Sequence, residues 1–455
     1  MAIQKSGARA WVSKRALRLP PLHRGHLAAV LLLVLYAWFW SVSVHRIHDA
    51  PFAAFARVFV TGCGDFEHFY DAARALRTGS DLYGSGVHGY IYPPLVAFLL
   101  MPLSRLPVQI AALTMLCLNL AMGLACAWLA ASEVMRRFRL GQAPVDVLVV
   151  AAVASLLVAT RLRSEFQMWQ TDVPMMLLMV LALRWLDDRP RLAGIALGLA
   201  VFIKFLPVVY LPWLLLRRRF QTASWMVAGM AAAAALPALA SGWIVNLHDL
   251  ETSLSGVLRL MGFATLGPRV ARVDAMTADY SVSVTSGLAR MLGPSASPTE
   301  ALAISAAVAV LVVALIVRVY RVAGAPVLAW PAAESQRERP YDGLVAIEWM
   351  ALIAFALAFG PQTNPRHTSL LLMVATVLSA LLCSAKPGVP RTATIAATAM
   401  LVFGLVFPPN LPELATTLAA WRGIGGTGWC LALMLPLVFR AGLRHVLPPD
   451  TDDRH

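Results

Sequence analysis

Charged side chains are scarce in this sequence of 455 residues, and their scarcity excludes a soluble protein. Only 14% of the residues are charged and 59% are hydrophobic, whereas soluble domains have roughly 25% and 45–50%. A soluble chain of this length can bury a large core, but so few charges cannot cover the remaining apolar surface. We therefore expect one integral membrane protein rather than several soluble domains.

Cysteine motifs and internal repeats are also lacking. The five cysteines include no CxxC pair and no metal-ligand spacing, and four of them lie within apolar runs: Cys117, Cys126, Cys383 and Cys430. No disulfide framework or zinc site is therefore expected. The sequence contains no visible inverted duplication of the kind found in many transporters, which counts against a transporter.

Long apolar runs are what the sequence does have. Their lengths match a hydrocarbon core of about 30 Å, and they predict an all-α, polytopic transmembrane helical bundle with about 11–13 transmembrane helices. The first run is too long for a signal peptide and follows a long polar, basic segment. The stretch 92–103 is broken by prolines and is expected to be a half-helix that does not cross. The expected spans are 27–45, 108–131, 144–160, 171–186, 191–203, 205–216, 222–241, 301–320, 341–359, 367–384, 392–408 and 428–440.

The net charge of +14 comes from short Lys and Arg clusters between apolar runs, such as Arg217, Arg218 and Arg219. That placement is typical of cytoplasmic loops and does not indicate a nucleic-acid-binding face. It predicts a cytoplasmic basic N-terminal tail (1–26), a single transmembrane domain (27–441) and a cytoplasmic C-terminal tail (442–455).

Two long loops, about 46–91 and 242–300, fall on the extracytoplasmic side of this topology. Each is expected to contain amphipathic helices, and those of the second loop could lie on the membrane surface. Loops of this length in a compact protein are usually functional.

Two acidic residues are candidates for a site on that side. Asp65 precedes an amphipathic segment with apolar residues at helical spacing, so it is either an N-cap or a general base beside the membrane. Asp172, with Gln170 close by, opens an apolar run. It is either an N-cap or an ionisable group that needs a cavity or a partner.

Cationic residues accompany them. Lys204 lies between two apolar runs, where it either extends its ammonium group toward the interface or binds a phosphate. Arg366 and His367 lie in a polar turn, either as ordinary interface residues or as an anion site. A carboxylate base and several cations on one side of the membrane suit an enzyme that acts on a lipid-linked phosphate.

The order of four segments resembles that of glycosyltransferase family 87, whose members are polyprenyl-phosphate-mannose-dependent mannosyltransferases with the GT-C fold. The similarity extends from about residue 60 to residue 385. The segments are "GDFEHFYDAARALRTGSDLYG", "YIYPPLVAFLLMPLSRLP", "WQTDVPMMLLMVLALRWLDDRPRLAGIALGLAVFIKFLPVVYLPWLLLRRRF" and "GPQTNPRHTSLLLM".

The resemblance implies roles for several residues. Asp65 matches the family's presumed general base for an inverting, direct displacement. Lys204 matches a lysine with a role at the donor phosphate, and His367 matches a histidine near the leaving phosphate. Tyr92 belongs to the family's Tyr-Pro-Pro element.

The sequence also departs from the family pattern. Gly-Gln-x-Asn is replaced by Trp169-Gln170-Thr171-Asp172, and Phe205 follows the lysine where proline is usual. The Asn-Gln-Ser element of the second loop has only Asp279-Tyr280-Ser281 as a counterpart. These positions put the substrate in doubt more than the fold.

The function expected is that of an inner-membrane, multi-pass glycosyltransferase with an extracytoplasmic active site. It would move a hexose, for which the resemblance implies mannose, from a polyprenyl-phosphate sugar to a glycolipid or glycan acceptor. Catalysis is expected from Asp65, with substrate binding by Lys204, Arg366, His367, Gln170, Asp172 and Tyr92, and with no metal or other cofactor. Two alternatives remain open: another polyprenyl-phosphate sugar as donor, or a lipid or solute transporter without chemistry.

Overall fold

The computed structural model describes residues 21–48, 65–86, 89–327, 342–384, 391–408 and 411–447. Throughout these ranges the regular structure is helical and contains no strand, which confirms the all-α prediction. Most of both predicted tails, the 49–64 part of the first loop and Cys63 lie outside the described residues.

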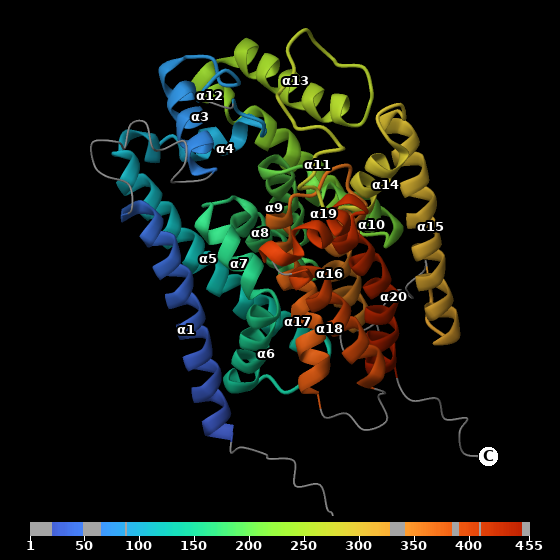
Figure 1. Ribbon diagram of the computed structural model, residues 1–455. Coiled ribbons are helices and arrows are strands. Elements are labelled where there is room, and N and C mark those ends of the chain that lie inside the picture. The colour runs from blue at the N-terminus through green and yellow to red at the C-terminus, as the bar shows by residue number, and fades with distance from the viewer. Residues whose placement is uncertain are drawn as a thin grey trace, which may run out of the picture.

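Long helices stand side by side and form most of the molecule (Figure 1). Within the described ranges, seven helices are long and apolar enough to cross a membrane, and the pair α6 (Pro144–Leu157) and α7 (Ala159–Gln167), bent by 74°, makes up to eight. The protein is therefore a multi-pass membrane protein. The seven are α1 (Pro21–His48), α5 (Val108–Arg137), α11 with α12 (Phe220–Ala235, Ala238–Ser241), α15 (Pro298–Val322), α16 (Asp342–Phe359), η3 with α17 (Pro365–Leu371, Leu372–Cys383) and α20 (Gly426–Val446).

Several of the expected 11–13 spans are shorter helices. The expected spans 191–203 and 205–216 correspond to α9 (Pro190–Ile203) and to η2 (Leu206–Val209) with α10 (Tyr210–Leu216). Lys204 has an extended backbone (φ −149°, ψ 141°) and ends α9, which is why the apolar sequence does not continue as one helix. The helices α8 (Asp172–Trp185) and α18 (Arg391–Val406) are also too short to qualify alone.

Smaller helices gather at one end of the bundle, at the top of Figure 1. They include α3 (Phe66–Thr78), α4 (Pro94–Leu100) and α13 (Trp243–Leu260), while α14 (Val284–Leu292) lies nearby and packs on α15. The seven residues of α4 rise only about 10 Å, which agrees with a half-helix that does not cross. α13 exposes Trp243 and Ile244, as expected of a helix lying on a membrane surface. The remaining short helices are η1 (Leu103–Arg105), η4 (Pro412–Leu414) and α19 (Ala415–Gly423).

Close packing of α9 against α11 fixes where α9 lies in the bundle. A Cβ atom on Gly198 would lie only 2.5 Å from the backbone oxygen of Met226, and one on Gly194 would lie 2.5 Å from that of Thr222. Only glycine permits this approach at either position. The contact holds the C-terminal end of α9, and with it Lys204, against the rest of the bundle.

Candidate active site

The structure brings all seven of the predicted site residues into one cluster at the end of the bundle near α3 and α4. They come from five separate stretches of chain, so their proximity is a result of the tertiary fold. The residues are Asp65 (before α3), Tyr92 (before α4), Gln170 and Asp172 (between α7 and the first turn of α8), Lys204 (after α9), and Arg366 and His367 (in η3).

Asp65 occupies the N-cap position of α3, but its side chain makes no capping hydrogen bond. Its Oδ2 instead accepts a hydrogen bond from Arg366 Nη1 at 2.6 Å and another from Gln170 Nε2. The interpretation of Asp65 as a simple cap is therefore wrong. The side chain is 27% exposed, so the carboxylate lies in the cluster and is still accessible to a substrate.

Lys204 is buried and paired within the bundle, so the alternative that its ammonium group extends toward the interface is wrong. Its Nζ donates to Asp172 Oδ1 at 2.5 Å and to Gln170 Oε1 at 3.1 Å. The same ammonium lies 5.3 Å from the centre of the Tyr92 ring, within range of a cation–π interaction. Lys204 thus joins the carboxylate, amide and aromatic groups of the cluster.

Asp172 is the first residue of α8, and Thr171 holds the cap position without a side-chain hydrogen bond. The capping interpretation of Asp172 is therefore also wrong. Its Oδ1 binds Lys204, and its Oδ2 lies 2.7 Å from His367 Nδ1. The carboxylate is fully buried, and these two partners compensate its charge.

Sequence reasoning missed two buried residues that hold this region. Glu165 in α7 accepts a hydrogen bond from the backbone N–H of Asp172 at 3.1 Å, and Asn119 in α5 donates to the backbone oxygen of Gln170 at 3.0 Å. Between them Trp169 adopts a left-handed backbone (φ 47°), which is strained for a residue other than glycine. Asn119, a lone asparagine within an expected span, was a signal that could have been used, whereas nothing in the sequence marked Glu165.

The second long loop reaches the same cluster. Tyr280 Oη donates to Asp274 and accepts from Gln362 Nε2 at 2.7 Å, while Ser281 Oγ accepts from the backbone N–H of Thr363 at 3.0 Å. Burial and the neighbouring Asp274 carboxylate raise the pKa of Tyr280, so the hydroxyl stays protonated. The segment 279–281 therefore lies against the turn that precedes Arg366.

The cluster combines an accessible carboxylate with an arginine, a lysine and a histidine. A carboxylate can remove a proton from a hydroxyl group, and a cationic surround can stabilise a departing phosphate. Among the described residues, no group of three or more His, Cys, Asp or Glu side chains has an arrangement that could hold a metal ion. The geometry therefore suits group transfer from a phosphate leaving group.

Comparison with known proteins also indicates group transfer from a lipid phosphate. A relative from Mycolicibacterium smegmatis, a polyprenol-phosphate-mannose-dependent alpha-(1-2)-phosphatidylinositol mannoside mannosyltransferase, is 27% identical over 400 residues, 82% of each chain. A relative of the same name from Mycobacterium tuberculosis is 31% identical over 194 residues, 38% of this chain and 44% of its own. The sequence pattern of glycosyltransferase family 87 matches residues 90–335, more than half of the chain. The protein is therefore a glycosyltransferase and belongs to glycosyltransferase family 87.

Proposed function

We propose that this glycosyltransferase transfers mannose from a polyprenyl-phosphate-mannose donor to a hydroxyl group of a glycolipid or glycan acceptor. The donor class is that named for both mycobacterial relatives, and phosphatidylinositol mannoside, their named acceptor, is the first acceptor to test. The observation that carries the proposal is the accessible Asp65 carboxylate held beside Arg366, Gln170 and the Lys204–Asp172 pair.

Asp65 acts as the general base in this proposal. The acceptor oxygen attacks the anomeric carbon of the donor while its proton passes to the Asp65 carboxylate. The bond between the anomeric carbon and the phosphate oxygen breaks, and the electron pair leaves with the polyprenyl phosphate. A single displacement of this kind inverts the anomeric configuration and needs no covalent enzyme intermediate.

Arg366, Lys204 and His367 hold the donor phosphate and stabilise it as it leaves. In the structure Arg366 is paired with Asp65, and Lys204 with Asp172. A donor phosphate competes for these cations, so its arrival draws Arg366 away from Asp65 and frees the carboxylate oxygen for the acceptor. Gln170 and Tyr92 orient the sugar from the two sides of Lys204.

The proposed location is a bacterial-type inner membrane, with the site facing the extracytoplasmic leaflet. The lysine and arginine clusters at the opposite end of the bundle support this orientation. We expect the charge on the leaving phosphate to be balanced by protein cations rather than a divalent metal. Turnover that is unchanged by EDTA fits this expectation, and turnover abolished by EDTA and restored by Mg²⁺ or Mn²⁺ contradicts it.

The test compares wild-type protein with Asp65→Asn in nanodiscs supplied with radiolabelled polyprenyl-phosphate-mannose and phosphatidylinositol mannoside. Asparagine keeps the size and most hydrogen bonds of the side chain but cannot take the proton. We expect transfer by the variant to fall by about 10²–10⁴-fold, the usual contribution of a general base. The anomeric configuration of the product, determined by NMR, reports inversion.

Asp71→Asn is the matched control because Asp71 lies on the same helix α3 and makes no contact with the cluster's cations in the described residues. It should retain wild-type transfer. Equal activity of Asp65→Asn and wild type would remove Asp65 from the mechanism. If wild type transfers no mannose, the mannose donor is wrong, and polyprenyl-phosphate glucose or arabinose is the next donor to test.

A further inference from the structure

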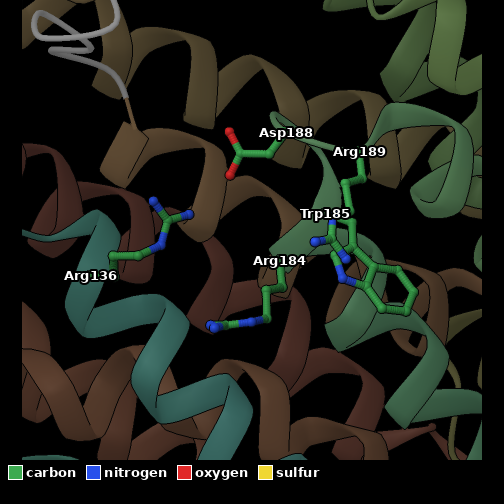
Figure 2. Close-up of a pocket in the computed structure, with 5 residues that line it drawn as sticks. All are labelled: Arg136, Arg184, Trp185, Asp188 and Arg189. Carbon is green, nitrogen blue, oxygen red and sulfur yellow. The ribbon is translucent and has the colours of Figure 1, made fainter.

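A second polar pocket lies at the opposite end of α8 from the Asp65 cluster. Its volume is about 400 Å³, and Figure 2 shows its lining: Arg136, Arg184, Trp185, Asp188 and Arg189. Arg184 and Trp185 are in the last turn of α8, while Asp172 is its first residue. The helix has 14 residues, so the two sites are about 20 Å apart along its axis.

Ion pairs next to the pocket already stabilise the C-terminal end of α8. Arg137 is fully buried and donates to Glu133 at 2.7 Å, to Asp187 at 2.8 Å and to the backbone oxygen of Leu183 at 2.9 Å. Arg136 binds both oxygens of Glu133, at 2.6 and 3.0 Å. The carbonyl end of α8 therefore has its cation, and stabilisation of that helix end does not require Arg184 or Arg189.

Three side chains that face the pocket, those of Arg184, Asp188 and Arg189, have few hydrogen-bond or ion-pair partners. Arg184 is 46% exposed, and its contact with Glu133 is long, at 3.9 Å. Within the described ranges, no hydrogen bond or ion pair is found for the side chains of Asp188 and Arg189. In Figure 2 the guanidinium groups of Arg136 and Arg184 and the carboxylate of Asp188 all project toward the same space.

Among the residues that line the pocket, Arg136 is paired with Glu133, and Arg184 and Arg189 face Asp188, which leaves one positive charge. Arginine binds phosphate oxygens through paired N–H groups. A ligand with one negative charge neutralises the pocket. A second negative charge on the ligand would be repelled by the Asp188 carboxylate. A phosphodiester fits this requirement better than a phosphate monoester.

The pocket also has the features of the membrane interface. Trp185 forms one wall, and tryptophan is enriched at the level of lipid headgroups. Leu192, two residues after the start of α9, is 42% exposed and offers an apolar surface next to Arg189 and Pro190. Basic pockets between transmembrane helices are known to bind phosphorylated lipid headgroups.

We propose that this pocket binds the phosphodiester of an anionic membrane phospholipid with one net negative charge. Arg184 and Arg189 bind the phosphate oxygens, Trp185 packs against the glycerol region, and the acyl chains lie along the adjacent apolar surface. The lipid is a bound component of the protein at the end opposite the catalytic cluster, so the proposal does not depend on the reaction proposed for Asp65.

Native mass spectrometry of the full-length protein in detergent tests the proposal, with phosphatidylglycerol as the probe. We expect phosphatidylglycerol binding to fall by about tenfold or more in the double variant Arg184→Gln/Arg189→Gln. Arg321→Gln should bind as wild type does, because Arg321 is an exposed arginine in the last turn of α15, away from the pocket. Equal lipid binding by the double variant and wild type overturns the site.

Two further arms separate a lipid from a soluble phosphate. Diacylglycerol has the same chains without the phosphate and should not compete. Glycerophosphoglycerol, the headgroup without chains, and inorganic phosphate should bind far more weakly than the lipid. Displacement by diacylglycerol, or equal affinity for the soluble phosphates, overturns the lipid assignment.

A gain-of-binding variant covers the case in which the double variant does not fold. Asp188→Asn removes the carboxylate that opposes the phosphate and leaves every hydrogen bond found for the cluster in place. We expect phosphatidylglycerol binding to rise by about threefold. Unchanged or weaker binding by a well-folded Asp188→Asn protein contradicts the proposal.

Discussion

The first and last turns of α8 each adjoin a cluster of charged residues, but the two clusters are built from different kinds of contact. At the first turn, partners come from remote parts of the chain: Arg366 and Asp65 are 301 positions apart. At the last turn, local contacts accompany remote ones: on α5, Glu133 binds Arg136 and Arg137, three and four residues away, while Arg137 also binds Asp187, 50 positions away. Contacts within a helix form with the helix, whereas those at the first turn exist only once the bundle is assembled.

We therefore expect the cluster around Arg137 to support stability and the cluster around Asp65 to support the proposed reaction. Arg137 has four carboxylate or carbonyl neighbours and no exposed surface, as expected of a structural ion pair. Asp65 is held by two donors yet remains partly exposed, as the proposed general base must be. Substitutions at the two ends should therefore affect different measurements.

The largest effect on stability is expected from Arg137→Met. The change removes the buried cation between Glu133 and Asp187 and leaves them only partly exposed cations, among them Arg136 and Arg219. Breaking a buried ion pair typically costs about 3–5 kcal/mol. We expect a large drop in the thermal unfolding temperature in detergent, with transfer per folded molecule close to wild type. Asp65→Asn should instead lower transfer per folded molecule and leave the unfolding temperature close to that of wild type. If Arg137→Met unfolds like wild type but has lost activity, the assignment of stability to the last turn of α8 and activity to its first turn is wrong.

A smaller effect is expected at Glu165, which contacts the backbone of the cluster and not the substrate. Glu165→Ala removes the acceptor that holds the Asp172 N–H, a hydrogen bond worth about 1–1.5 kcal/mol, so kcat should fall by about tenfold. The donor KM should change little, because Lys204 and Arg366 remain.

Glu165→Gln is the control, since its amide oxygen can still accept that hydrogen bond. It should recover most of the activity lost in Glu165→Ala. If Glu165→Gln is as impaired as Glu165→Ala, the carboxylate charge matters and a positioning role is insufficient.

The smallest effect is expected at Asp249 in α13, outside the membrane-spanning helices. Burial raises its pKa to about 6, because Arg269 and His248 only partly offset the loss of water. The folded state therefore favours the protonated acid, and this contribution is present at low pH and lost as the pH rises through about 6. Asp249→Asn should raise the unfolding temperature by about 1–2 °C at pH 7.5.

At pH 4.5 the same variant should gain much less, because the carboxyl is then protonated in the folded protein and is ionised only in the unfolded chain. A gain of equal size at both pH values would mean that ionisation of Asp249 is not the cause.

Sequence alone predicted the seven residues that the structure brings together around Asp65, but not their contacts. The membrane class followed from apolar run lengths, and the order of motifs selected Asp65, Lys204 and His367. Capping preferences offered a local explanation for Asp65 and Asp172, which the structure overturns because both carboxylates bind residues far away in sequence. Local rules describe only neighbours along the chain, so they cannot identify such partners.

The number of spans and the supporting residues were harder to predict for a related reason. The break at Lys204 was predicted, but the helices on its two sides are too short to cross alone. Sequence hydropathy also does not report the contact with Asp172 that holds Lys204. Glu165 was overlooked because its partner is a backbone N–H, which has no signature in the sequence.

The tight contact between α9 and α11 has a consequence for engineering this enzyme. Gly194 and Gly198 touch no site residue, yet any larger side chain there would push α9 outward and carry Lys204 with it. Libraries aimed at new acceptors should leave both glycines untouched and diversify Tyr280 and Gln362, which lie at the edge of the site. Directed evolution should therefore find few tolerated changes along this helix pair and many in the loop above it.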